Sequence, residues 1–194
     1  GTVDVSVSGG SEDAEEAGSN ATGSYFLGHM DLISSDLEFT SDLDQSGGYS
    51  GGTQKIGLRF NTLSVPKGAT ITNAYMRFRA IAADSPNTNS NSAILTIRGQ
   101  AADNPTTFTS TTFNISNRPL TSASVGWGPE GWTSGASYNT TDLTAMVQEI
   151  VNRAGWASNN SMAFIITGTG SRSAASYDGT PATAPLLHID WEMP

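Results

Sequence analysis

The chain has 194 residues, of which 18 are acidic and 9 basic, with two histidines and no cysteine. This balance argues against nucleic acid or an anionic membrane surface as a partner, because both require clustered positive charge. The lack of cysteine excludes disulfides, thiolate metal sites and a thiol nucleophile. No apolar run approaches the ~18 residues that cross a bilayer, and the first residues lack signal-peptide features, so we expect a mature segment without membrane insertion.

Alternating apolar and polar residues predict strands along most of the chain, near residues 3–8, 35–40, 55–61, 70–82, 93–101, 162–168 and 186–191, with weaker ones between them. One stretch has a helical period instead. In residues 142–153, apolar residues recur every three or four positions, which predicts a short amphipathic helix that begins near Asp142. Residues 162–166 are apolar on both faces, which predicts the core on one side and this helix on the other. The pattern predicts one all-β domain, an antiparallel β-sandwich or jelly roll with one short amphipathic helix.

A series of landmarks runs in order through residues 54–191: Arg59-Phe60, Pro66, Gly68-Ala69, Ile71, Ala74, Phe78, Trp127, Trp132, Asp142-Leu143, Val147-Gln148, Ser171-Arg172 and Pro185-Leu186-Leu187. Their order resembles that of the DNRLRE-type (disaggregatase-related) β-sandwich domain. The resemblance implies a secreted carbohydrate-binding or adhesion module, since some members of that family bind alginate. The chain departs from the family at Ser171-Arg172-Ser173, where Ser-Arg-Glu is expected, and in the longer tail to Tyr177-Asp178-Gly179. On this interpretation, residues 1–53 form acidic N-terminal strands and loops of the same single module.

The first 54 residues contain ten acidic residues and no lysine or arginine. Calcium takes ~6 to 8 oxygen ligands, and it would relieve the repulsion among these carboxylates and order an acidic loop. Within a strand, Asp36 and Glu38 would point to one face and Leu37 and Phe39 to the other. The predicted calcium ligands are Glu12, Asp13, Glu15, Glu16, Asp36 and Glu38, with Asp190 and Glu192 as outside candidates. The alternative is a solvated acidic loop, with Asp36 and Glu38 paired to arginines such as Arg59.

A second candidate site follows from the two-residue period of the strands, which assigns Arg59, Tyr75, Arg77, Arg79 and Arg98 to the same outer face. Arginine offers planar paired donors, so such a face suits the carboxylates of an acidic polysaccharide. The alternative is an ordinary exposed ladder of arginine and carboxylate pairs, each contributing only ~0 to 1 kcal/mol.

Aromatic residues in a glycine-rich loop form the third candidate site. Trp132 and Tyr138 could stack on sugar rings at a loop tip, and Tyr25, Tyr49 and Tyr177 are further exposed candidates. The alternative is that the tryptophans are buried and plug the end of the sandwich.

No catalytic motif is present: the chain lacks G-x-S-x-G, H-E-x-x-H and a phosphate-binding loop, and we interpret His29 and His188 as structural. We therefore expect a non-catalytic carbohydrate-binding or adhesin module, stabilised by calcium and monomeric within a larger secreted or cell-surface protein. Its expected partner is a polysaccharide or cell-surface glycan of acidic character. The alternatives are a structural spacer domain and a polysaccharide hydrolase or lyase.

Overall fold

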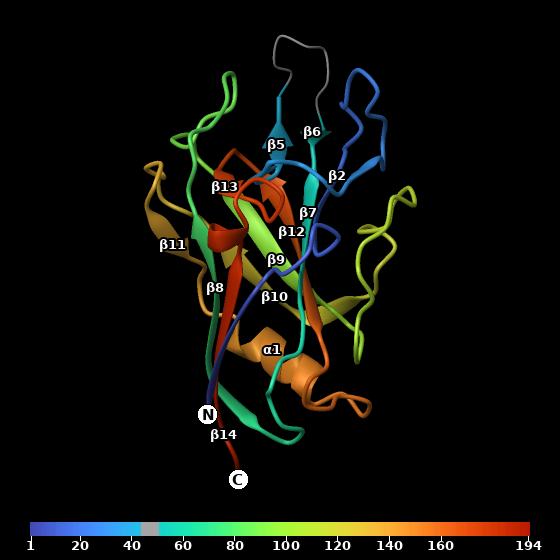
Figure 1. Cartoon of the computed structure of the whole chain (residues 1–194), viewed down its shortest axis with the longest axis vertical. Coiled ribbons are helices and arrows are strands. Elements are labelled where there is room, and N and C mark those ends of the chain that lie inside the picture. The colour runs from blue at the N-terminus through green and yellow to red at the C-terminus, as the bar shows by residue number, and fades with distance from the viewer. Residues whose placement is uncertain (44–50) are drawn as a thin grey trace.

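Two antiparallel sheets form the body of the molecule, which a computed structural model describes over residues 1–43 and 51–194 (Figure 1). The smaller sheet has the strand order β1 (Thr2–Ser6), β14 (Leu186–Glu192), β8 (Thr70–Arg79) and β11 (Ser137–Asn139). The larger sheet has the order β10 (Leu120–Trp127), β9 (Ile94–Gln100), β12 (Met162–Thr169), β7 (Lys55–Phe60), β2 (Asp13–Glu16) and β3 (Met30–Asp31). Two short ribbons pair β4 (Asp36–Glu38) with β13 (Ser173–Ala175) and β5 (Ser41–Asp42) with β6 (Gly52–Thr53).

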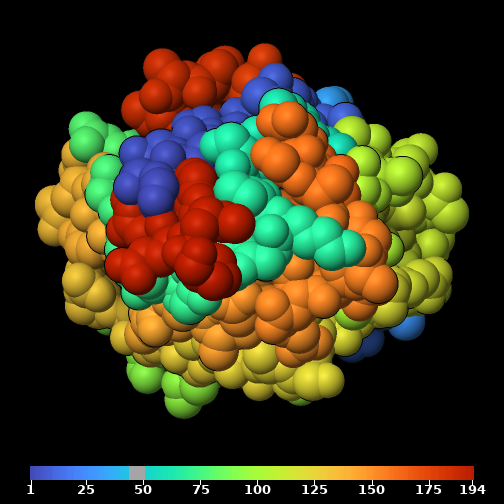
Figure 2. Space-filling view, turned by 90° about the horizontal axis from the view of Figure 1, so that it is seen from below, coloured from blue at the N-terminus to red at the C-terminus, as the bar shows by residue number. Residues whose placement is uncertain are grey.

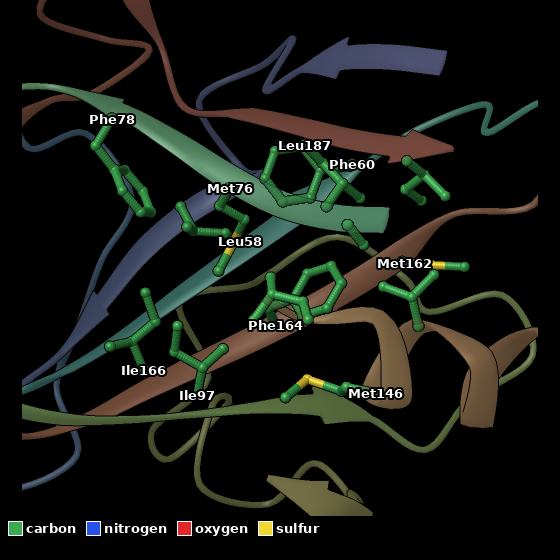
Figure 3. Packing of buried hydrophobic residues seen from close by; sticks show 14 of the residues in the cluster. Leu58, Phe60, Met76, Phe78, Ile97, Met146, Met162, Phe164, Ile166 and Leu187 are labelled. Carbon is green, nitrogen blue, oxygen red and sulfur yellow. The ribbon is translucent and has the colours of Figure 1, made fainter. Parts of the chain in front are cut away.

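The hydrophobic core lies between the two sheets because alternate residues of each strand point inward. Met76 and Leu187 of the smaller sheet pack toward Phe60, Phe164 and Ile166 of the larger one, and all five are fully buried (Figure 3). Burial of each such side chain contributes ~1.5 to 3 kcal/mol. The predicted fold class, an all-β sandwich with one short helix, is confirmed.

The helix α1 (Thr144–Val151) begins where Asp142 accepts a hydrogen bond from the Thr144 N–H at 2.9 Å. Its apolar stripe packs chiefly on β8, β9 and β10 at one end of the sandwich. The expectation that this helix covers the second face of β12 is wrong. Ile165, on that face, packs instead against Phe108 and Ile115 from the segment between β9 and β10.

The two ends of the sandwich differ in what they carry. The chain termini lie at the α1 end (Figure 1), where Gly1 pairs with Trp191. Seen from this end, the N-terminal and C-terminal segments are side by side (Figure 2). The β5–β6 ribbon lies at the opposite end (Figure 1). In the described residues, no helix is long and apolar enough to cross a membrane.

Candidate functional site

The acidic segment after the first strand forms β2, which the sequence predicts as a loop. Its four side chains are buried, and β2 lies between β7 and β3 in the larger sheet. Alternation along the strand directs Ala14 and Glu16 to one face and Asp13 and Glu15 to the other. Ala14 packs in a small cluster with Ile115, so Asp13 and Glu15 face the β4–β13 ribbon side.

Glu12 and Glu16, two of the predicted calcium ligands, have basic partners. Oε1 of Glu12 lies 2.7 Å from Nη1 of Arg59. Oε1 of Glu16 lies 3.7 Å from Nζ of Lys55, and its Oε2 accepts the Ser116 N–H at 2.8 Å. These contacts neutralise both buried carboxylates, as buried charges require.

Three other acidic side chains meet between β2 and β4, and we call Glu15, Asp36 and Glu38 the carboxyl row. Oε1 of Glu15 accepts hydrogen bonds from the Glu38 N–H and from Nε2 of Gln54, both at 2.9 Å. Nε2 of Gln54 also donates to the Glu38 carbonyl oxygen at 2.9 Å, which holds Glu15 against β4, where Asp36 and Glu38 project to one side. In the described residues, no lysine, arginine or histidine forms an ion pair with the row.

Burial controls the protonation of these carboxyl groups. It raises the pKa of Glu38 to about 8, and the adjacent Asp36 charge adds to the shift. Burial and then the Glu38 charge raise the pKa of Glu15, and burial likewise raises that of Asp36. The pKa of Asp13 rises to about 6 for the same reason, although the Tyr177 N–H donates to its Oδ2 at 2.7 Å and favours the charged form.

The six predicted calcium ligands therefore lie in three separate environments: two with basic partners, one beside Tyr177, and three in the carboxyl row. Within residues 1–43 and 51–194, no three acidic or histidine side chains have the arrangement of a metal site. The outside candidates Asp190 and Glu192 belong to β14 in the smaller sheet. Calcium binding stays a prediction.

The outer side of the smaller sheet carries an aromatic and basic surface, which we call the Tyr75 face: Tyr75, Arg77 and Arg79 of β8 with Leu186 and His188 of β14. Tyr75 is directly opposite His188, and their rings stack with centroids 4.6 Å apart. The Arg77 guanidinium carbon lies 5.5 Å from the Tyr75 ring centroid. The strand pairing thus gathers these side chains into one surface.

His188 connects this surface to two carboxylates. Its Nδ1 lies 2.7 Å from Oδ1 of Asp4, and its Nε2 lies 3.0 Å from Oδ2 of Asp190. Partial burial acts to lower the pKa of His188, but the hydrogen bonds to Asp190 and Asp4 outweigh it, and the net shift is upward. Hydrogen bonds from Thr2 and then from His188 lower the pKa of Asp190. The end of the face around His188 is therefore acidic.

Farther along the strands, the Tyr75 face contains a hollow of about 190 Å³. Arg77, Arg79, Leu186, Ser137 and Ser6 of β1 line it together with the short helix η1 (Pro181–Thr183). Nε of Arg77 donates to Oδ1 of Asn139 at 3.0 Å. In the described part of the chain, no carboxylate lies within ion-pair distance of either arginine. Two arginines without acidic partners thus border one hollow.

The single arginine face predicted from alternation is wrong. β7 and β9 belong to the larger sheet, so Arg59 and Arg98 lie on a different sheet from Arg77 and Arg79. The Arg59 side chain is only 12% exposed and binds Glu12, whereas Arg98 is exposed. The period of a strand determines which residues share a side, but not which sheet the strand joins.

The predicted role of Trp132 in sugar stacking is contradicted by its burial. Trp132 is 6% exposed and packs against Phe39 and Trp127, with ring centroids 5.7 and 6.0 Å apart. The alternative, in which the tryptophans close the end of the core, is confirmed. Tyr138 stacks on Trp132 at 5.2 Å, and its hydroxyl oxygen accepts the N–H of residue 133. Tyr49 lies outside the described residues.

A second hollow, of about 380 Å³, lies beside the segment before β4. Tyr25 and Ile33 line it with His29 and Asp31. The Tyr25 hydroxyl donates to the Asp31 carboxylate, and the Tyr25 and His29 rings stack at 4.5 Å. The carboxylate in its wall makes this hollow a poor site for a polyanion. Tyr177, the remaining aromatic candidate, packs partly buried against the core.

His188, Leu186 and η1 are parts of this candidate site that sequence reasoning missed. Alternation within residues 186–191 already assigns Leu186 and His188 to one side of a strand. What it lacks is the pairing of that strand with β8, which brings His188 onto Tyr75.

Comparisons with known proteins do not assign the chain to a family. No family model matches it, and a search of curated proteins finds no match. The similarity to DNRLRE-type domains therefore stays a prediction.

Proposed function

We propose that the chain is a non-catalytic module of a secreted or cell-surface protein, which binds an acidic polysaccharide on the Tyr75 face and is stabilised by calcium. The observation that carries the glycan component is the pair Arg77 and Arg79 at one hollow. They have no carboxylate partner in the described residues, although acidic residues outnumber basic ones two to one in the chain.

Arginine at this position suits a uronate. The planar guanidinium forms two parallel hydrogen bonds to one carboxylate, which gives direction as well as attraction. Leu186, which lines the hollow, and the Tyr75 ring, 5.5 Å from the Arg77 guanidinium carbon, offer apolar contact to the C–H faces of a sugar ring. The site therefore combines two features of an acidic sugar, its charge and its apolar ring face.

Charge also limits the extent of the binding surface. Asp4 and Asp190 flank His188 and would repel a polyanion there. We therefore expect the ligand to occupy the η1 end of the face, over the hollow, rather than to extend along the strands to His188.

The test is binding of the purified domain to immobilised acidic and neutral polysaccharides, with Arg77→Gln and Arg79→Gln as variants. Each should weaken binding of acidic polymer by ~10-fold or more, because each loses a charged hydrogen bond. Arg98→Gln is the matched control, since it removes an exposed arginine from the other sheet, and its affinity should change by less than ~2-fold.

Two outcomes would favour the other functions. If neither acidic nor neutral polymers bind, a structural spacer is the better account. If reducing ends or unsaturated products appear during incubation, the domain is a hydrolase or lyase. Equal losses of affinity in Arg79→Gln and Arg98→Gln would show that acidic polymer is attracted by exposed arginines in general and that the hollow is not the binding site.

The calcium component of the proposal rests on the acidic first quarter of the chain, where ten carboxylates precede the first basic residue. Calcium prefers oxygen ligands and tolerates irregular coordination, which suits a segment rich in carboxylates. Thermal unfolding in calcium and in chelator tests it, and an unchanged Tm would contradict it.

A further inference from the structure

The β4–β13 ribbon has one face in the core and one face directed away from it. Leu37 and Ala174 are both in the main core and are cross-strand partners. The neighbouring residues Asp36, Glu38 and Ser173 therefore project to the other side, because side chains alternate along a strand. Directly opposite residues share a side, so Ser173 faces the same space as Glu38.

β2 approaches this second face of the ribbon and adds Glu15 to it. The Glu15 carboxylate accepts the Glu38 N–H and the Gln54 amide through the same oxygen, Oε1. Glu15 thus lies against the Glu38 backbone, and Asp36 and Glu38, two residues apart in β4, project to the same side. Three buried or half-buried carboxyl groups thus meet without an ion-pair partner in residues 1–43 and 51–194.

A second, independent observation is the Ser173 side chain. Ser173 is fully buried, and its Oγ has no hydrogen-bond partner. Buried hydroxyl groups are nearly always hydrogen-bonded, so an unpartnered one beside carboxyl groups points to a ligand. Because Ser173 stands directly opposite Glu38, its Oγ is directed into the space that Glu38 and Asp36 share.

We propose that Asp36, Glu38 and Ser173 Oγ bind one calcium ion, with Glu15 as the third carboxylate. This assignment deepens the calcium component of the proposed function and rests on it, but not on the glycan component. All four side chains offer oxygen, the ligand atom that calcium prefers. Asp and Glu have two and three rotatable side-chain bonds, so adjacent carboxyl groups in a row can turn toward one ion without moving the backbone.

The ion would connect parts of the fold that share few other contacts. Glu15 belongs to the larger sheet, whereas Asp36, Glu38 and Ser173 belong to the β4–β13 ribbon. Calcium bound to all of them would fix the ribbon on the sheet. We therefore expect the ion to stabilise this end of the sandwich without contacting the hollow on the Tyr75 face, which lies on the smaller sheet.

The experiment titrates calcium, and separately magnesium, into chelator-treated protein by calorimetry, and compares Tm with and without calcium. At a hundredfold excess over Kd, calcium should raise the Tm by about 5 to 10 °C, and magnesium should bind more weakly. Glu38→Gln should weaken calcium binding by ~10-fold or more. Glu130→Gln, which removes an exposed carboxylate, is the matched control and should bind as the unmodified protein does.

Ser173→Ala separates a ligand from a structural role. Without calcium, this variant should be as stable as the unmodified protein or more so, because it removes a buried hydroxyl that has no partner. With calcium, its affinity should fall by ~10-fold. Calcium binding that is absent, or equal in Glu38→Gln, Ser173→Ala and the unmodified protein, would overturn the assignment. Calcium binding without glycan binding would overturn the glycan component alone.

Discussion

Arg59 is expected to be a structural residue rather than part of a ligand surface, and its replacement tests this directly. Its Nη1 lies 2.7 Å from Oε1 of Glu12, its Nε donates to the Pro105 carbonyl at 2.7 Å, and its Nη2 donates to Ser161 Oγ at 2.9 Å. The Glu12 side chain is only 6% exposed. Arg59→Met would therefore leave a buried carboxylate without its cation.

Breaking one side of a buried ion pair costs ~3 to 5 kcal/mol. We expect Arg59→Met to lower the free energy of unfolding by that amount, measured by urea denaturation with an unchanged m value. The double variant Glu12→Gln/Arg59→Met should lose less free energy of unfolding than the two single variants lose together, because it no longer buries an unpaired charge. A loss below ~1 kcal/mol in Arg59→Met, together with weaker glycan binding, would refute this reasoning and return Arg59 to the ligand surface.

Three further predictions concern pH, the aromatic cluster and a tight turn. His188 has a raised pKa in the folded protein, so its ion pairs with Asp4 and Asp190 stabilise fully below pH ~6.5 and are lost as pH rises through the folded pKa. In urea, His188→Gln should therefore have a lower free energy of unfolding than the unmodified protein at pH 5, and this difference should shrink by pH 9. A difference that grows with pH would contradict the prediction. Trp132→Ala should cost ~3 to 5 kcal/mol in the same assay while the folded variant keeps its glycan affinity, since the ring is buried. Gly179→Ala would bring a β-carbon to 1.8 Å from a backbone carbonyl oxygen, so a loss of ~1 to 3 kcal/mol or more is expected, and a neutral result would contradict the close approach.

The arginines show how far strand periodicity extends. Alternation correctly pairs Arg77 with Arg79 on one side of β8, because both lie in a single strand. It gives no means of relating β8 to β7 or β9, since sheet membership depends on long-range pairing. The prediction therefore joined Arg59 and Arg98 to a face that belongs to the other sheet. Strand alternation determines which side of its strand a residue occupies, whereas sheet topology determines which strands lie side by side.

The helix prediction had a similar limit. The apolar period of residues 142–153 identified a helix that spans Thr144–Val151, because a helical stripe is a local property. The surface that it covers is not local. The β9–β10 segment supplies Phe108 and Ile115 to the outer face of β12, so the helix packs at the end of the sandwich instead.

The acidic segment shows why charge alone misassigns structure. A run of Asp13, Glu15 and Glu16 beside Glu12 suggests a solvated loop, because isolated buried carboxylates are costly. In the fold, each of these carboxylates has its own donors: Arg59 for Glu12, a backbone N–H for Asp13, and amide or ammonium groups for the other two. With the donors supplied by distant parts of the chain, the segment can form a buried strand. Glu15 differs from the other three because burial and then the Glu38 charge raise its pKa, and the calcium site that we propose includes this carboxyl group.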